Sequence, residues 1–171
     1  MRLLFLLVSM WSLGFSGFLS APSAAAVRRG TESLEKAIYR KVNDYRAGEG
    51  LRRLRWDDRL AGQAREHSEA MAQGRRGFGH ARFSRRIKAA GIEFTSAGEN
   101  VGQNQGFDDP ADQAIEGWLR SPGHRANIEG RYNLTGVGVA RSRNGTFFFT
   151  QIFMLAPDPG NKSAKPGTLS R

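Results

Sequence analysis

The stretch "LTGVGVARSRNGTFFFTQIFM", residues 134–154, predicts a β-hairpin. Its two halves, "LTGVGVA" and "TFFFTQIFM", are apolar runs of strand length rich in β-branched and aromatic residues. The connection "RSRNG" contains Asn144-Gly145, a pair suited to a type I′ turn. This hairpin is the strongest β signal in the chain.

Upstream of the hairpin, apolar residues recur at helical spacing. One helix is expected from a cap at Thr31 or Ser33 to Gly48, and a second follows an Asp57 cap and ends at Gly74. A short helix is expected at about 83–90, and Asp109-Pro110 begins another that runs to about residue 120.

The remaining segments carry weaker patterns. "LRRLRW", residues 51–56, is a short extended piece, and "IEFTSAGENVGQNQG", residues 92–106, is glycine- and amide-rich and is expected to be irregular. Helices first and a hairpin last predict an α+β domain, with helices packed on an antiparallel sheet.

The ends of the chain differ in composition from the middle. Residues 1–26 combine an early positive charge, an apolar run and "SAAA", which predicts a secretory signal peptide cut after Ala26. The alternative is an uncleaved membrane anchor, because the run approaches the length of a bilayer span. Residues 27–155 then form one domain, without a transmembrane segment once the signal is removed, and residues 156–171 resemble a disordered tail.

The net charge indicates which classes of partner the protein could attract, and the cysteine content indicates how the fold is stabilised. The formal net charge is +10 and there is no cysteine, so stability must come from packing and not from disulfides. Such a charge attracts polyanions, and secretion favours envelope lipids or anionic cell-wall polymers. No nucleic-acid-binding motif accompanies the basic residues, which disfavours DNA or RNA.

Several pieces in a particular order resemble the CAP superfamily of cysteine-rich secretory, antigen 5 and pathogenesis-related 1 proteins, in its cysteine-free bacterial branch. The pieces are "VNDYRAGEGLRRLRWDDRLAGQAREHSEAMA", "GHARF", "GEN", "AIEGWLRSPGHRANI", "GVGVA" and "FFFTQIF", and they cover about residues 33–154. The resemblance implies an α-β-α sandwich, with helices on both faces of a small antiparallel sheet.

The resemblance also implies a surface cleft, which two histidines and two glutamates line in eukaryotic members. His80 of "GHARF" and Glu99 of "GEN" match two of these four positions. The other two are not kept, since Ser121 and Phe148 stand where the second glutamate and the second histidine are expected.

His124 is the candidate replacement for the missing groups. Ser121 is a good N-cap and Pro122 a good first helical residue, so "SPGHR" begins a new short helix with His124 in its first turn. The helix dipole there disfavours the imidazolium form. Asn100 and Gln151 are expected to border the same pocket, or else to bond the backbone of neighbouring loops.

If His80, Glu99 and His124 converge, three interpretations are open. Two neutral imidazoles and a carboxylate suit zinc, with His80 and His124 as metal ligands. The same groups suit general acid/base work without metal. Alternatively, His124 and Glu99 only fix the fold. The third histidine, His67, lies on an inward stripe and is expected to bond a backbone carbonyl.

A run of basic residues brackets His80 and would draw an anionic or phosphate-bearing ligand if it rims the cleft. The run consists of Arg75, Arg76, Arg82, Arg85, Arg86 and Lys88.

Three functions are therefore compatible with the sequence. The first is a secreted or periplasmic binding module for a lipid or anionic envelope ligand, as the resemblance implies. The second is a metal-dependent hydrolase acting on peptide or cell-wall material, and the third is a non-catalytic interaction scaffold.

Overall fold

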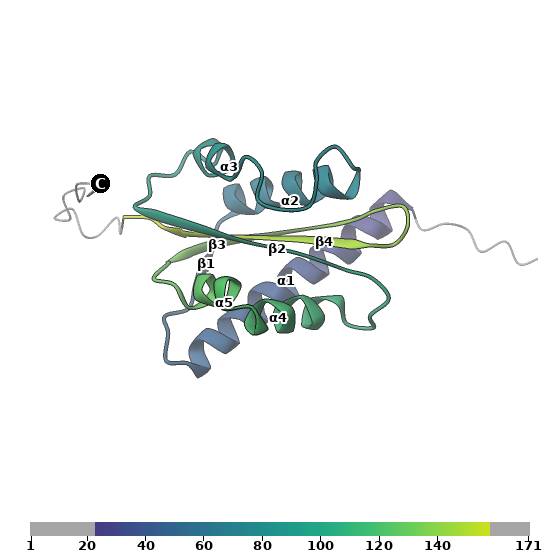
Figure 1. Ribbon diagram of the computed structural model, residues 1–171. Coiled ribbons are helices and arrows are strands. Elements are labelled where there is room, and N and C mark those ends of the chain that lie inside the picture. The colour runs from purple at the N-terminus through teal and green to yellow at the C-terminus, as the bar shows by residue number, and fades with distance from the viewer. Residues whose placement is uncertain (1–22, 158–171) are drawn as a thin grey trace, which may run out of the picture.

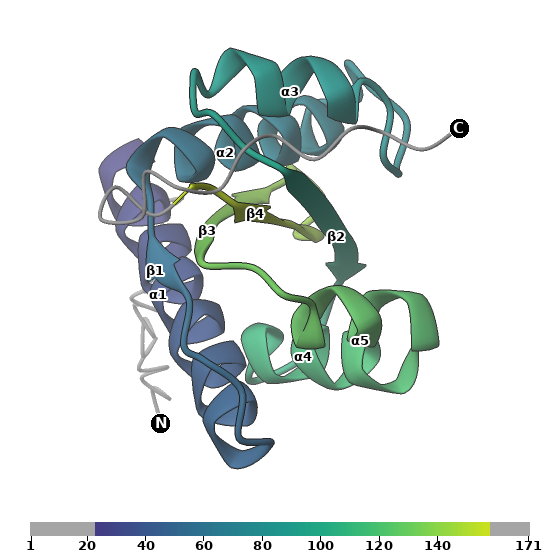
Figure 2. The same cartoon turned by 90° about the vertical axis from the view of Figure 1, so that its left-hand side faces the viewer.

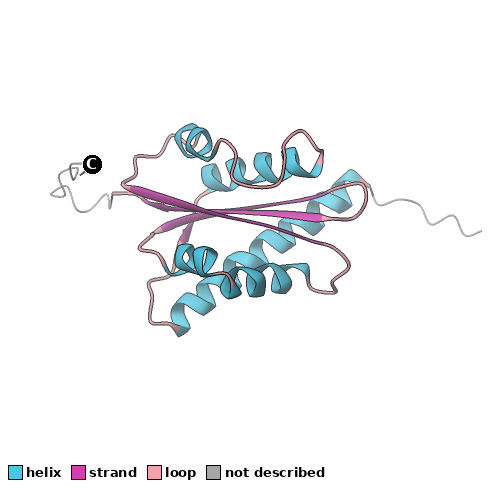
Figure 3. Ribbon diagram, in the orientation of Figure 1, coloured by secondary structure: helices cyan, strands magenta, loops and turns pink. Residues whose placement is uncertain are grey.

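The chain folds into three layers, with a sheet between two layers of helices (Figures 1 and 3). The computed structural model describes residues 23–157. Helices α2 (Asp58–Ala72) and α3 (Phe83–Ala89) cover one face of the sheet. The other face packs against α1 (Ala24–Gly48), α4 (Pro110–Arg120) and α5 (Pro122–Glu129). The predicted α-β-α sandwich is confirmed.

The sheet has four strands in the order β1-β3-β4-β2. The strands are β1 (Arg55–Trp56), β2 (Ser96–Asn104), β3 (Leu134–Arg141) and β4 (Phe147–Leu155). β4 pairs antiparallel with both β3 and β2, whereas the two-residue β1 pairs parallel with β3. The sheet is therefore mixed and not wholly antiparallel, and β2 lies at one of its edges.

The hairpin predicted at 134–154 is present as β3 and β4, but its turn is not type I′. A type I′ turn needs positive φ at two central residues, and here only Gly145 has it, at 92°. Gly145 N–H donates to Ser142 O at 3.0 Å, and Ser142 N–H donates to Thr146 O at 2.9 Å. This is a turn closed by a glycine bulge, which lengthens the loop by one residue.

Local capping signals locate most helix ends correctly. The Asp57 side chain accepts from Arg59 and Leu60 N–H groups at the start of α2, and Asp109 accepts from Asp112 N–H at the start of α4. α1 ends at Gly48 as expected but begins at Ala24, because Ser23 caps it by accepting from Ala26 N–H. The expected start at Thr31 or Ser33 is therefore wrong by about two turns.

The sheet and helices enclose two apolar cores, one on each face. One is centred on Phe149 and Phe153 against α1, α4 and α5, and the other on Ile152 and Met154 against α2 and α3. Helix α2 packs directly on β3, because Gly136 and Gly138 have no side chain to hold it off. A Cβ at Gly138 would overlap the backbone nitrogen of Arg65.

The segment expected to be irregular at 92–106 instead contains β2, so that expectation is wrong. Glycine is rare in strands, so the sequence of this segment does not look like a strand. The glycines are needed here because neighbouring side chains occupy the space that a Cβ would fill. A Cβ at Gly98 would lie 2.7 Å from Tyr132 Oη, and one at Gly102 would lie 3.1 Å from Trp118 Nε1. The strand thus depends on tertiary packing and not on local propensity.

The predicted signal peptide and C-terminal tail fall largely outside the described residues, and both remain predictions. Among the helices of residues 23–157, none combines the length and the apolar character needed to cross a bilayer.

Candidate functional site

The edge strand β2 lies between the layer of α2 and α3 and the layer of α4 and α5 (Figure 2). Side chains alternate along a strand, so Glu99 points into the layer of α2 and α3 while Asn100 points into the layer of α4 and α5. His80 comes from the loop between α2 and α3, and His124 from the first turn of α5. Their ring centroids lie 6.4 Å apart, close enough for one ligand to contact both imidazoles.

Glu99 is a buried carboxylate whose two oxygens are both occupied. Arg86 Nη2 donates to Oε2 at 2.7 Å and to Oε1 at 2.8 Å, and Arg86 Nε donates to Oε2 at 3.0 Å. The side chains of Glu99 and Arg86 are 2% and 8% exposed, so the pair is shielded from water. The carboxylate therefore holds its surroundings in place and has little capacity left to activate water or bind a metal.

Glu99 also fixes the orientation of His80. Its Oε1 lies 3.0 Å from His80 Nδ1, and because a carboxylate only accepts, Nδ1 carries the proton. Nε2 is then the ring nitrogen left for a ligand. The His80 side chain is 53% exposed, so the buried Arg86–Glu99 pair supports an imidazole that solvent and ligands can reach.

His124 occupies the position that the helix-start argument predicted. Ser121 is the N-cap residue of α5 and Pro122 its first helical residue, although the Ser121 side chain makes no capping hydrogen bond. Burial lowers the pKa of His124, and the neighbouring His80 lowers it further. Burial and the charge of His80 therefore add to the helix dipole in favouring the neutral imidazole.

Asn100 and Gln151 have no exposed surface, so neither offers an atom to a ligand. Asn100 Nδ2 donates to His124 O at 3.0 Å, and its Oδ1 accepts from Asn127 Nδ2 at 3.0 Å. Gln151 donates to Thr135 Oγ1 at 3.1 Å. The expectation that they border the pocket is not met. Asn100 instead positions α5, and with it His124, by the backbone bonding that was the stated alternative.

A groove of about 410 Å³ begins at His124 and runs between β2 and α4. We call it the β2–α4 groove. Its wall includes Phe107, which is 48% exposed, and the nearly buried Trp118. Gly117 also lines it, and a Cβ there would meet no atom within 4 Å. Sequence reasoning missed this groove because it depends on β2, which the sequence did not reveal.

The predicted zinc ligands do not assemble into a full metal site. Across residues 23–157, no three His, Asp or Glu side chains are grouped so that they could hold a metal ion. His80 and His124 are neighbours, but the third predicted ligand, Glu99, is taken up by Arg86. The donor set therefore does not fit zinc as the sequence suggested.

None of the basic residues of the run lines the β2–α4 groove at His124. Arg86 is buried as the partner of Glu99, which corrects its assignment to the rim. All five arginines of the run line a separate hollow between α2 and α3, beside His67, whereas Lys88 is not part of it. Sequence reasoning missed the Arg86–Glu99 pair, since nothing local indicates that α3 and β2 meet.

The structural interpretation of His67 from the sequence is confirmed. His67 is buried, and its Nε2 lies 2.8 Å from Gly79 O, the backbone carbonyl bond expected of it. Trp118 is 2% exposed, and it therefore lies in the core although its side chain also lines the β2–α4 groove.

The comparisons with known proteins agree with the fold and the motifs. The profile of the cysteine-rich secretory protein family, CAP, matches residues 39–153. The uncharacterized membrane protein YlbC of Bacillus subtilis is 37% identical over 126 residues, which are 70% of this chain and 34% of that protein. The chain thus spans about a third of this relative's length.

Two solved structures are similar. An extracellular protein of Bacillus anthracis containing an SCP domain superposes with a TM-score of 0.67 and 27% identity, over 80% of this chain and 45% of that one. An outer surface protein of Borrelia burgdorferi has a TM-score of 0.65 and 19% identity, over 74% of this chain and 95% of that one. At that identity the second likeness concerns the fold alone.

Proposed function

Since the chain belongs to the cysteine-rich secretory protein (CAP) family, in its cysteine-free bacterial branch, we propose that it is a secreted or periplasmic binding module for an envelope lipid. Secretion is supported by the apolar run and "SAAA" of residues 1–26. It is also supported by the similarity to an extracellular protein of Bacillus anthracis.

The observation that carries the proposal is that His124, which neighbours His80, also lines the β2–α4 groove. The groove has the size of a small-molecule site and is walled by Phe107, Ala114 and Trp118. His124 lies at its polar end, 6.4 Å from His80. An amphipathic ligand would place its apolar chain in the groove and its polar end beside the two imidazoles.

Binding is favoured over catalysis by the state of Glu99. A general base needs a free lone pair within reach of the proton it removes. Both Glu99 oxygens accept from Arg86, and one also accepts from His80. Glu99 therefore supplies neither a metal ligand nor a base, and the metal-dependent hydrolase lacks its predicted metal ligand set within residues 23–157.

The proposal is tested by native mass spectrometry of protein purified from its own host without detergent. We expect a fraction of the protein to carry a lipid-sized adduct that organic solvent removes. The His124→Ala variant should lose most of the adduct while keeping its melting temperature, because Asn100 bonds the backbone and not the side chain of His124. Adduct-free protein that also binds no lipid from a panel would overturn the proposal.

A further inference from the structure

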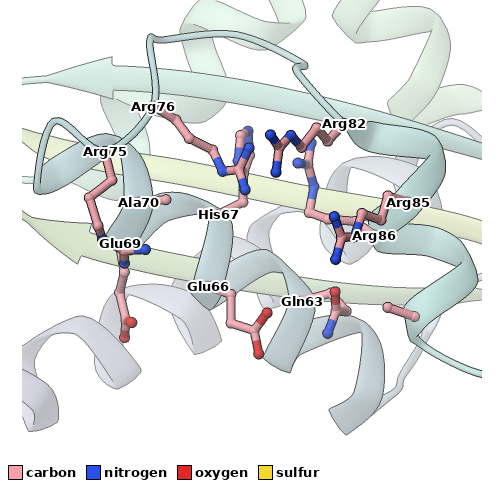
Figure 4. A pocket seen from close by; sticks show the side chains of 11 residues that line it. Gln63, Glu66, His67, Glu69, Ala70, Arg75, Arg76, Arg82, Arg85 and Arg86 are labelled. Carbon is pink, nitrogen blue, oxygen red and sulfur yellow. The ribbon is translucent and has the colours of Figure 1, made fainter.

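A second hollow, of about 410 Å³, lies between α2, α3 and the loop that joins them. We call it the arginine hollow. Figure 4 shows the side chains of Arg76 and Arg82 pointing toward each other above His67. It is lined by Arg75, Arg76, Arg82, Arg85 and Arg86, with Glu66 and Glu69 as its acidic residues.

Most of the positive charge in this hollow is not neutralised within residues 23–157. Arg86 pairs with Glu99, and Arg75 bonds only the neutral Gln73. Arg76, Arg82 and Arg85 have no acidic partner within 4.0 Å in that part of the chain. The carboxylates of Glu66 and Glu69 point away from the gathered guanidinium groups (Figure 4).

The crowding of positive charges affects the pKa of Arg76. Desolvation lowers the pKa of its guanidinium, and the charges of Arg82 and Arg86 lower it further. Like charges held this close repel one another unless an anion lies among them. Folding has nevertheless brought these side chains together from α3 and from the loop that precedes it.

Two further features of the hollow concern His67 and Arg82. His67 donates from Nε2 to Gly79 O, and its buried Nδ1 has no hydrogen-bond partner among the described residues; as an acceptor, Nδ1 would not itself bond a phosphate oxygen. Arg82 has a φ of 62°, the only positive value at a non-glycine residue within residues 23–157. Such a conformation is disfavoured for a long side chain and often marks a functional site.

We propose that the arginine hollow binds a phosphate ester of headgroup size, at a site separate from the β2–α4 groove. Guanidinium groups suit this chemistry because each can donate two parallel N–H bonds to phosphate oxygens. Phosphate supplies several acceptor oxygens for several arginines at once. The ester could belong to a soluble metabolite or to a lipid headgroup, and the proposal does not depend on the proposed lipid function.

The test is calorimetric titration of the full chain with glycerol 3-phosphate at low ionic strength. We expect about one site per chain and at least tenfold weaker binding in the double variant Arg76→Gln/Arg85→Gln, a loss of about 1.4 kcal/mol. The Arg76→Lys/Arg85→Lys variant keeps the charge without the paired N–H geometry and should fall between the two.

The matched control is Arg29→Gln/Arg143→Gln, which removes the same charge from two exposed residues outside the hollow. It should bind within about twofold of the unaltered protein, and all variants should melt within a few degrees of it. Equal weakening in the hollow and control variants, or no binding at millimolar glycerol 3-phosphate, would overturn the proposal.

A second arm separates the two sources of phosphate. Vesicles of phosphatidylcholine with phosphatidylglycerol are mixed with the protein and then with glycerol 3-phosphate. Displacement by the soluble ester, with loss of vesicle binding only in the hollow variant, assigns the site to lipid headgroups. Binding of the soluble ester without vesicle binding assigns it to a free phosphate ester. Vesicle binding that the ester does not displace, and that both variants weaken equally, is diffuse charge attraction and contradicts a site.

Discussion

Arg86 Nη2 lies 2.7 Å from Oε2 and 2.8 Å from Oε1 of Glu99, and both side chains are almost fully buried. This ion pair joins α3 to the edge strand β2 and supports His80 from beneath. Arg86 also lines the arginine hollow. The ion pair therefore lies between the arginine hollow and His80.

Glu99→Gln should lower the free energy of unfolding by about 3–5 kcal/mol, because it leaves the buried Arg86 charge unpaired. Chemical denaturation measures this directly. The control is Glu116→Gln, which breaks an exposed pair with Arg120 and should change the free energy by less than about 0.5 kcal/mol. The double variant Arg86→Met/Glu99→Leu removes both charges and should recover most of the stability. A loss below about 1 kcal/mol in Glu99→Gln would contradict the importance of the pair.

Gly138→Ala should destabilise the protein by about 3 kcal/mol, because the new methyl group would push α2 away from β3. Gly62→Ala is the matched control. Gly62 lies within α2, and its Cβ would meet no atom within 4 Å, so alanine should stabilise the helix by about 0.5–1 kcal/mol. The melting temperatures of the two variants measure this difference. Equal effects of both substitutions would contradict the close packing of α2 on β3.

The free energy of unfolding should fall as the pH drops below about 6.5. Burial lowers the pKa of His67 and of His124 from the usual 6.5, so the folded state binds fewer protons than the unfolded state. Stability is therefore fully present above the unfolded pKa and is lost as the pH falls through it, by at most about 1.4 kcal/mol per pH unit for each histidine.

Urea denaturation at several pH values between about 7.5 and 5 measures this slope. His67→Gln keeps an N–H that can reach Gly79 O but does not titrate, so its slope should be shallower than that of the unaltered protein. If the free energy of unfolding has the same pH slope in both proteins, His67 does not contribute to the pH dependence of stability.

Features that depend on a few neighbouring residues were predicted from the sequence, whereas features that depend on contacts between distant segments were not. The caps at Asp57 and Asp109 and the start of α5 at Pro122 are set by a few neighbouring residues, and each was predicted correctly. Strand β2 was missed because Gly98 and Gly102 are required by side chains distant in the sequence.

The candidate site shows the same division. His80, Glu99 and His124 were identified from motifs, but their proximity, and the capture of Glu99 by Arg86, arise only when α3, α5 and β2 pack together. Asn100 was identified as a polar neighbour, yet periodicity could not show that it bonds the backbone of His124.

The β2–α4 groove is proposed to hold the apolar chain of a lipid, and a substitution that fills the groove tests this. Gly117→Phe places an aromatic ring in open space within it, whereas Glu116→Phe adds the same ring to the neighbouring residue of α4, which does not line the groove. The measurement is the dissociation constant of a fluorescent single-chain fatty acid for each variant. We predict at least about tenfold weaker binding in Gly117→Phe, unchanged binding in Glu116→Phe, and unchanged glycerol 3-phosphate binding in both. Full fatty-acid affinity in Gly117→Phe would contradict lipid binding in the β2–α4 groove.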